Sequence, residues 1–542
     1  MDSMADLFKR LEQLNAIGTA LSSERNIDRL LENIVLAAKA ITHADGGTLY
    51  RVSEDRQALR FAIVRTDSLK IAYGGTTGQP IPPEFPDLPL YGVGGEPNSA
   101  MIAACSAIYG QTVNIADAYT VDGFDFSGTR EFDRVTGYRS RSFLSVPMKN
   151  HEHEVIGVLQ LINAIDPDGG AVRAFSDADR RLAESLASQA AIALTNRLLV
   201  SQLEELFESF INLINLAIDE KSPYTGGHCQ RVPSLTMMLA EAANATRDGP
   251  LARFTMSDKD RYELKIAALL HDCGKVTTPV HIVDKATKLQ TLFDRIALVD
   301  TRFEVLKRDA ELRLWRAIAA GTERPVAERR LAEELRAIDD DRSFLRRVNI
   351  GGEAMRAEDQ ARVRQISVRY RWVNTQGEED GFLSPDEIEN LTIRAGTLTP
   401  AERETIKYHI VATIKMLESL PWPKHLKHVP EYAGGHHERM DGKGYPKHLK
   451  REEMSIPARI MGIADIFEAL TARDRPYKDG MKLSDALRIL ANFRDNGHID
   501  PDLFDVFVKQ KVYLRYAEQY LESAQIDVVG RLLSPGDLAG AR

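Results

Sequence analysis

The sequence predicts a multidomain protein that consists of an α+β domain, a long linking helix and an all-helical domain. Its 542 residues exceed what one ordinary hydrophobic core can serve, so two or three domains are expected. Strand-like apolar runs, broken by Gly, Pro and Asp turns, occupy residues 47–165. From residue 219 to about residue 520, apolar side chains recur at helical spacing almost throughout.

The N-terminal part of the chain combines helices with strands. Residues 5–42 carry apolar side chains at helical spacing, and residues from 175 to about 218 do so again. Between them, the runs TLYRV, RFAIV, SFLSVPM and VIGVLQLINA predict strands. We therefore expect an α+β domain over residues 1–185, a linking helix over 186–218, a helical domain over 219–525 and a tail over 526–542.

Composition and charge limit the classes of function. Hydrophobic residues make up 43% and charged residues 27%, which is typical of a soluble globular protein. No apolar run is long enough to span a bilayer, so membrane insertion is not expected. The three cysteines lack metal-type spacing and the N-terminus lacks a signal-peptide core, which predicts a cytoplasmic location. The net charge of −9 argues against a nucleic-acid polymer as partner.

The linking helix carries apolar residues three and four apart, with one polar position among them. They are Ile192, Asn196, Leu199, Leu203, Leu206, Phe210 and Leu213. This spacing is typical of a coiled-coil seam and predicts a parallel homodimer whose helix joins the two domains. The alternative is a helix that packs on its own domain, because the run is only about three heptads long.

The helical half is rich in side chains that can bind metals. They occur in the segments YTGGH, LLHDCGK, IKYH, GGHHERMDGKGYP and IADIFEALT. Imidazole and carboxylate together suit first-row metals such as iron, manganese, zinc or nickel. An adjacent His-Asp pair can serve two cations, because the carboxylate can bridge them in phosphoryl chemistry. By contrast, we interpret His425, His428 and His448 as packed or solvated side chains.

Three segments give a specific family resemblance. HDCGK, HHERMDGKGYP and ADIFEALTARDRPYK resemble those of the HD-GYP phosphohydrolases, a branch of the HD superfamily, over about residues 207–520. The resemblance implies a helical bundle that hydrolyses cyclic di-GMP to pGpG and often to GMP, or in some members cyclic GMP-AMP. It also implies two divalent metal ions, with iron or manganese favoured. The implied ligands are His228, His271, Asp272 and Asp465 for one metal, and a bridging Asp272 with His409, His436 and His437 for the other.

The same resemblance implies a set of substrate-binding residues. They are Lys275, Asp441, Gly442, Gly444, Tyr445, Arg475 and Lys478. Lys275 lies one helical turn after His271 and would bind the scissile phosphate beside the catalytic Asp272. Glycines allow close backbone approach to a ligand, and the Tyr445 ring can face a guanine. Glu438, like Asp441, is expected to act as a hydrogen-bond partner around the site rather than as a ligand.

The sequence departs from the family pattern at two places. Some members carry a glutamate four residues before the first histidine and hold a third metal, whereas here Tyr224 stands at that position and favours a dinuclear site. The usual short link after the His-Asp pair is interrupted by an insertion of roughly residues 290–393. Its highly charged first part predicts two long helices joined near Gly321–Pro325, and a structural role is favoured over a gate or a partner site.

The α+β domain resembles a GAF domain over about residues 10–200. The segments NIADAYTVDGFDFSGTREFDRVTGYRSRSFLSVPM and GVLQLINA carry the resemblance, which is closest to the cyclic-nucleotide-binding type. Of that type's signature, Asn163, Phe175 and Asp179 match and are possible ligand residues, whereas Ala164 and Arg180 replace a lysine and a glutamate. A cyclic nucleotide is the first expectation for its ligand, and another small molecule or a dimerisation role are the alternatives.

Three functions follow from these resemblances. The favoured one is a cyclic di-GMP phosphodiesterase under the control of the GAF domain. The second is a non-catalytic receptor for the dinucleotide, and the third is an HD-type hydrolase acting on another nucleotide such as cyclic GMP-AMP. A degenerate receptor tends to lose metal-binding residues, and none of the seven is missing here. The intact DGKGYP segment argues for a cyclic-dinucleotide substrate.

Overall fold

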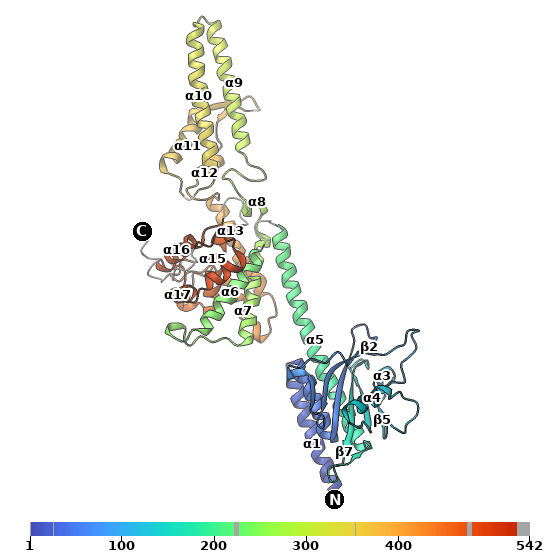
Figure 1. Cartoon of the computed structure of the whole chain (residues 1–542). Helices are drawn as coiled ribbons and strands as arrows, with labels where there is room; N and C mark the ends of the chain where they lie inside the picture. Colours follow the sequence, from blue (N-terminus) through green and yellow to red (C-terminus); the bar gives the residue numbers. More distant parts are fainter. Residues whose placement is uncertain are drawn as a thin grey trace. The chain divides into compact units, whose positions relative to one another are not determined.

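The structure is a computed structural model that describes residues 2–24, 26–221, 227–352, 354–374, 376–473 and 480–527. The chain divides into two compact units, Met1–Leu206 and Phe207–Arg542. The predicted fold class is confirmed, with a sheet-containing first unit and a helical second unit (Figure 1). Within the described residues, no helix has both the length and the apolar character needed to cross a membrane.

The first unit is built on one antiparallel sheet whose strand order is β3-β2-β1-β7-β6-β5, with β4 paired to β2 and β8 to β7. The strands are β1 (Ala44–Val52), β2 (Ala58–Thr66), β3 (Ile71–Gly74), β4 (Leu88–Pro89), β5 (Val113–Ile115), β6 (Phe143–Lys149), β7 (Val155–Ile165) and β8 (Val172–Arg173). The helices are α1 (Asp2–Ser23), α2 (Ile27–Thr42), α3 (Ile102–Tyr109), α4 (Ser127–Thr136) and the start of α5 (Asp177–Lys221).

The alternation of side chains along the central strands divides this unit into two layers. Leu49 and Leu159 point to the face that α1, α2 and α5 cover, where they join a large apolar core. Tyr50 and Val158, their immediate neighbours, point to the opposite face, which α3 covers (Figure 1). The second face therefore has a separate, smaller core, and it is on this side that the unit contains a cavity.

Glu32 on α2 ties that helix to the sheet. Its carboxylate accepts hydrogen bonds from Arg65 Nη2 at 2.8 Å and from Thr76 N at 3.0 Å. Burial raises the pKa of this carboxyl, but Thr76 and Arg65 outweigh burial and lower the pKa from 4.5 to about 2. The ionised carboxylate therefore stabilises the fold. This stabilisation is fully present when the pH is above the carboxyl's pKa in the unfolded chain, and it is lost as the pH falls from about 4.5 toward 2.

We expect Glu32→Gln to destabilise the first unit by on the order of 2 kcal/mol at pH 7, because an amide replaces a carboxylate that is bonded to a guanidinium. Hydrogen exchange in peptides that cover α2 and β2 should rise in the full-length variant, and the difference from the wild type should narrow at pH 4. Glu54→Gln, at an exposed position, is the matched control. Equal exchange in Glu32→Gln and the wild type would contradict this role.

The helix α5 is a single element of 45 residues that begins in the first unit and ends in the second. The apolar positions of the predicted seam are exposed on the single chain; they are Ile192, Leu199, Leu203, Leu206, Phe210 and Leu213. Asn196 is exposed as well. Within the described residues, this stripe is therefore not packed on the helix's own domain.

The second unit is a helical bundle around one core. Its helices are α6 (His228–Ala245), α7 (Asp258–Leu270), α8 (Val280–Val283), α13 (Pro400–Glu418), α14 (Val429–Gly434), α15 (Ile456–Thr471), α16 (Leu483–Asp495), α17 (Pro501–Lys509) and α18 (Val512–Tyr520). Leu239 of α6, Ile463 of α15 and Phe507 of α17 are fully buried in this core. Capping boxes at Ser257 and Thr399 fix where α7 and α13 begin.

The insertion forms a subdomain with a core of its own. It comprises α9 (Ile296–Ala319), α10 (Arg324–Asn349), α11 (Ala357–Arg369), the hairpin β9 (Arg371–Val373) and β10 (Glu379–Gly381), and α12 (Pro385–Leu391). The two long charged helices and their junction agree with the sequence prediction. Phe303 packs against Phe382 with ring centroids 4.5 Å apart. At the base, the fully buried Lys285 pairs with Glu402 at 2.8 Å and joins the two ends of the insertion.

Candidate metal centre

The seven predicted metal ligands lie together in the second unit. They come from five places in the sequence: the start of α6, the end of α7, the middle of α13, the end of α14 and the middle of α15. Six of the ligands form two groups, and within each group the potential metal-binding atoms all lie within 4.8 Å of one another. The first group consists of His228, His271 and Asp272. The second consists of His409, His436 and His437.

Asp272 occupies the centre of the arrangement. Its Oδ2 lies 3.1 Å from His228 Nε2 and 3.2 Å from His271 Nε2, while its Oδ1 lies 3.4 Å from His409 Nε2. Asp465 Oδ1 adds a second carboxylate 3.3 Å from His228 Nε2. One carboxylate thus faces both histidine groups through its two oxygens, which is the geometry that a bridging ligand needs.

The turn that carries Asp272 can approach α13 only because residue 274 is glycine. The Gly274 backbone N donates to Thr413 Oγ1 at 2.9 Å. A Cβ at this position would lie 2.0 Å from the His409 carbonyl oxygen and 2.5 Å from Thr413 N. The absence of a side chain therefore brings the His271–Asp272 pair beside His409.

Backbone hydrogen bonds set the orientation of three imidazoles. His271 Nδ1 donates to the Ala268 carbonyl at 2.7 Å, and His436 Nδ1 donates to the Ala433 carbonyl at 2.6 Å. His409 Nδ1 is bonded in the same way to the Ile406 carbonyl, three residues earlier. Each ring then presents an unprotonated Nε2 to the centre, which is the form in which histidine binds a metal.

The electrostatics of the site also suit a metal. Burial lowers the pKa of His436 to about 4 and also lowers the pKa of His409 and His437, so these rings are neutral at pH 7. Burial raises the pKa of Asp272, but the charge of Lys275 and a hydrogen bond from His228 outweigh it and hold that pKa well below its ordinary value. These three neutral imidazoles beside an ionised carboxylate suit metal binding, whereas the Glu468 carboxylate outweighs burial and raises the pKa of His228 well above its ordinary value, so that ring must release a proton to bind a metal.

Three buried nitrogen and oxygen atoms that could bind a metal have no hydrogen-bond partner in the described residues. They are His271 Nε2, His436 Nε2 and Asp272 Oδ1. Buried polar atoms are normally satisfied, and all three of these point into the space where the imidazoles converge. Bound cations would satisfy them, so the residues present fit two first-row divalent metals in a nitrogen and oxygen environment.

The predicted substrate residues divide into those beside the metal ligands and those that shape the loop. Lys275 Nζ lies 2.5 Å from Asp272 Oδ2, and its side chain is 26% exposed. The Tyr445 ring stacks on His437 with centroids 4.9 Å apart. Asp441 instead shapes the loop, because its carboxylate accepts a hydrogen bond from Arg439 Nη2 at 2.8 Å.

The two loop glycines are required by the backbone. Gly442 has a φ of +75°, and a Cβ on Gly444 would lie 2.4 Å from Glu438 Cα. The buried Glu438 accepts from Lys447 N at 2.6 Å and thereby holds the end of the loop. Three predicted positions, Tyr224, Arg475 and Lys478, lie outside the described residues.

Sequence reasoning did not identify Glu468 as part of the site. This buried carboxylate lies one turn after Asp465 on α15, and its Oε2 is 2.5 Å from His228 Nδ1. Arg231 Nε donates to its other oxygen at 2.7 Å and fixes the carboxylate in place. Glu468 therefore orients His228 so that Nε2 faces the centre. The signal in the sequence was the spacing of three residues after a predicted ligand, which places both side chains on one helix face.

We expect Glu468→Gln to weaken divalent metal binding by about 10–100-fold, because the amide no longer fixes the tautomer and angle of the His228 ring. Calorimetric titration of the metal-free full-length chain with Mn²⁺ or Fe²⁺ measures the metal affinity. Glu518→Gln, at an exposed position on α18, is the matched control and should titrate like the wild type. Unchanged affinity in Glu468→Gln would remove Glu468 from the site.

The three possible ligand residues of the first unit lie outside its cavity. Asn163 binds the backbone of the preceding loop, with Oδ1 accepting from Arg141 N at 2.7 Å. Phe175 belongs to the core under α1, α2 and α5, and Asp179 pairs with Arg173. None of the three lines the cavity of about 380 Å³ in this unit.

Comparison with known families divides the chain in the same way. A family model described as a GAF domain matches residues 26–194. Two models described as HD domains match residues 225–346 and 381–503, so the first match extends into the insertion and residues 347–380 lie between the two.

Several curated relatives match parts of the chain. A 3'3'-cGAMP-specific phosphodiesterase 1 of Vibrio cholerae is 44% identical over 81 residues, which are 15% of this chain and 19% of the relative. A cyclic di-GMP phosphodiesterase of Pseudomonas aeruginosa is 38% identical over 146 residues, 27% of this chain and 33% of the relative. A 3'3'-cGAMP-specific phosphodiesterase 3 of Vibrio cholerae is 26% identical over 304 residues, 56% of this chain and 38% of the relative. The matched segments thus span well under half the length of these relatives.

Among solved structures, the GAF domain of a phosphoenolpyruvate-protein phosphotransferase from Acinetobacter covers 36% of this chain and 98% of its own, with 18% identity and a TM-score of 0.26. The two HD matches enclose the helices that carry the predicted ligands, and the GAF match covers the sheet of the first unit. The chain consists of a GAF domain followed by an HD region of HD-GYP-like architecture.

Proposed function

We propose that this chain hydrolyses a cyclic dinucleotide, with cyclic di-GMP as the first candidate substrate, at the metal centre of its HD region. The observation that supports this most strongly is the convergence of five imidazole rings and the Asp465 carboxylate around Asp272. The intact loop from His436 to Pro446, whose Tyr445 ring lies against a predicted ligand, supports a nucleotide substrate.

The chain's own side chains divide the chemical work. His228, His271 and Asp465 would hold one cation, and His409, His436 and His437 a second, with Asp272 facing both. When bound, two divalent cations lower the pKa of water and neutralise charge that develops on a phosphoryl group. Iron or manganese suits this mixed nitrogen and oxygen donor set.

Lys275 and Tyr445 have separate tasks. The Lys275 ammonium, next to Asp272 yet partly exposed, can place a positive charge on a non-bridging phosphate oxygen. Burial raises the pKa of Tyr445, so its hydroxyl stays protonated and can donate a hydrogen bond. Its ring can stack with a base, and Lys407 lies 5.6 Å from the same ring.

The alternatives are a hydrolase for 3'3'-cGAMP and a receptor without turnover. The completeness of the ligand set favours an enzyme over a receptor. The experiment incubates the metal-loaded full-length chain with cyclic di-GMP and, separately, with 3'3'-cGAMP, and follows linear products by chromatography. We expect pGpG, with or without GMP. Turnover of 3'3'-cGAMP alone would reassign the substrate, and tight binding of both without product would contradict hydrolysis.

We expect Lys275→Met to retain both metals and to lower kcat about 100-fold or more, because it removes one charge aimed at the phosphate while leaving the ligands intact. Elemental analysis and steady-state kinetics on the same preparation separate the two effects. Lys407→Met, at a half-buried lysine over Tyr445, is the control for loss of a charge near the mouth of the site. Loss of metal in Lys275→Met would show that this lysine organises Asp272 instead.

Regulation and assembly complete the proposal. A small ligand in the GAF domain would control the metal centre through α5, within a homodimer. The supporting observation is the unbroken helix with its exposed apolar stripe, to which Leu203 contributes at 64% exposure. Light scattering on the full-length chain should give the mass of two chains, and Leu203→Lys should shift it toward one. A single-chain mass for the wild type would contradict this arrangement.

A further inference from the structure

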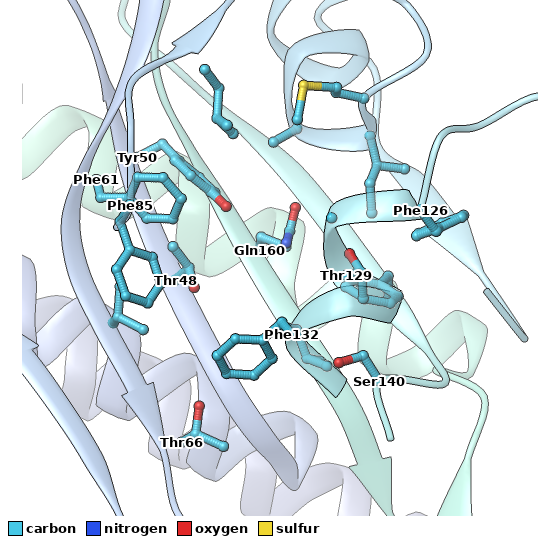
Figure 2. Close-up of a pocket in the computed structure, with 18 of the residues that line it drawn as sticks. Thr48, Tyr50, Phe61, Thr66, Phe85, Phe126, Thr129, Phe132, Ser140 and Gln160 are labelled. Atoms are coloured by element: carbon cyan, nitrogen blue, oxygen red, sulfur yellow. The ribbon is translucent and has the colours of Figure 1, made fainter. Parts of the chain in front are cut away.

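The GAF domain contains a cavity of about 380 Å³ between the sheet and the helices α3 and α4 (Figure 2). This volume is of the size that holds a small organic molecule. Its lining comes from the strands β1, β2, β3, β4, β6 and β7, the loop before β4, the helices α3 and α4, and the segment after α4. The cavity lies on the side of the sheet opposite the large core of α1, α2 and α5.

The floor of the cavity presents polar groups without partners. Thr48 and Gln160 are paired across β1 and β7 and therefore point to the same face. Tyr50, two residues further along β1, points to that face too, and Figure 2 shows all three around the open space. Their relative exposures are 5%, 8% and 4%.

These three groups have free hydrogen-bonding capacity. Ser145 Oγ donates to Gln160 Oε1 at 3.1 Å, which leaves the Gln160 amide nitrogen to donate elsewhere. Within the described residues, neither that nitrogen nor the hydroxyls of Thr48 and Tyr50 bond to another residue. Buried polar groups of this kind indicate a ligand that supplies one or two matching atoms.

The walls on either side are aromatic. Phe61 lies between Tyr50 and Phe85, with ring centroids at 4.7 and 5.2 Å, and these rings form one wall. Phe126 lies on the opposite side (Figure 2), and Phe143, whose ring centroid is 5.4 Å from that of Phe126, also lines the cavity. Ring faces and edges at this spacing favour a flat, largely apolar molecule.

The charge of the cavity discriminates against anions. Of the residues that line it, all of which are described, none is lysine, arginine or histidine. The two ionisable acids among them, Glu84 and Asp125, are exposed and therefore lie toward solvent. A hydrogen bond from the Ser127 backbone N lowers the pKa of Asp125, so this group is charged at neutral pH.

The first turns of two helices also border the cavity, and helix N-termini attract anions. At α4 the Asp125 carboxylate already accepts from Ser127 N at 2.8 Å, so that end is neutralised by the protein itself. The other end, at Ile102 of α3, contributes about half a charge, so the two helix ends together supply about one positive charge against the two negative charges of Glu84 and Asp125. The balance therefore opposes a phosphate group.

We infer that this cavity binds an uncharged, flat aromatic molecule that accepts a hydrogen bond from Gln160, and that it excludes cyclic nucleotides. This revises the first expectation from the sequence. The three signature residues that favoured a nucleotide support the backbone and the core outside the cavity. The inference concerns binding in the GAF domain, so it stands or falls whether or not the HD region hydrolyses a dinucleotide.

Two fluorescent probes with the same rings test this charge preference. N-phenyl-1-naphthylamine is uncharged, and 1-anilinonaphthalene-8-sulfonate adds one sulfonate. On the full-length chain, we expect the uncharged probe to bind saturably and at least about tenfold more tightly than the sulfonate. Cyclic GMP should not displace it. Equal affinity of the two probes, or displacement by cyclic GMP, would overturn the inference.

Two sets of variants locate the effect. Ala103→Phe fills the cavity from a residue that is 3% exposed, and saturable binding of the uncharged probe should be lost. Glu84→Gln with Asp125→Asn changes only exposed acids, so the fold should tolerate it even if Ala103→Phe does not fold. This double variant should bind the sulfonate several-fold more tightly and the uncharged probe as before. No gain for the sulfonate would contradict the electrostatic explanation.

Discussion

Asp272→Asn is expected to lower the rate of hydrolysis at least about a thousandfold and to remove one or both metals. The reason is that Asp272 faces both histidine groups: Oδ2 lies 3.1 Å from His228 Nε2, and Oδ1 lies 3.4 Å from His409 Nε2. An amide keeps the volume of the side chain but lacks the charge, and it turns one acceptor oxygen into a donor nitrogen. The substitution also leaves Lys275 without its closest ion-pair partner.

Elemental analysis and product chromatography on one preparation measure both effects. Asp495→Asn, at the exposed last residue of α16, is the matched control and should keep metal content and turnover. Circular dichroism should show that Asp272→Asn retains its helices. If the variant keeps two metals and hydrolyses at the wild-type rate, Asp272 is not the residue that joins the two metal positions.

Gly274→Ala is expected to damage the same site without changing any ligand. Its Cβ would meet the His409 carbonyl oxygen at 2.0 Å and Thr413 N at 2.5 Å, and both are backbone atoms of α13 that cannot rotate away. The turn carrying His271 and Asp272 must then move away from His409. We expect the free energy of unfolding to fall by about 3 kcal/mol, because inserting volume into a packed contact forces the backbone to shift.

The measurement uses tryptophan fluorescence, since Trp315, Trp372 and Trp422 all lie in the second unit. Denaturant unfolding gives the stability, and metal titration of the same sample gives the affinity, which should fall at least tenfold. Gly352→Ala is the control, because a Cβ there meets nothing within 4 Å. A Gly274→Ala variant as stable and as metal-loaded as the wild type would show that this contact does not set the site.

The sequence predicted the fold class because local patterns determine it. Alternation along residues 47–165 and helical spacing beyond residue 219 are properties of neighbouring residues, and the GAF and HD matches bear them out. The predicted ligands could be named because HDCGK and HHERMDGKGYP are dense, restrictive segments. Their roles as metal ligands remain predictions, which the geometry around Asp272 supports.

Other parts of the site depend on tertiary contacts that local patterns do not contain. Glu468 matters because α15 faces α6, which a reading of spacing alone cannot establish. Gly274 reads as an ordinary loop glycine until α13 lies against it. The lining of the GAF-domain cavity comes from eight helices and strands that are far apart in the sequence. The matched signature residues Asn163 and Asp179 lie elsewhere, where Asn163 binds the backbone and Asp179 forms an ion pair.

The most direct test is anomalous X-ray diffraction from crystals of the full-length chain purified without oxygen and loaded with iron or manganese. Two peaks should appear, one within bonding distance of His228 and His271 and the other of His409 and His436, with Asp272 touching both. A single peak that Asp272 does not touch, or metals held by other residues, would contradict the account of a shared dinuclear centre.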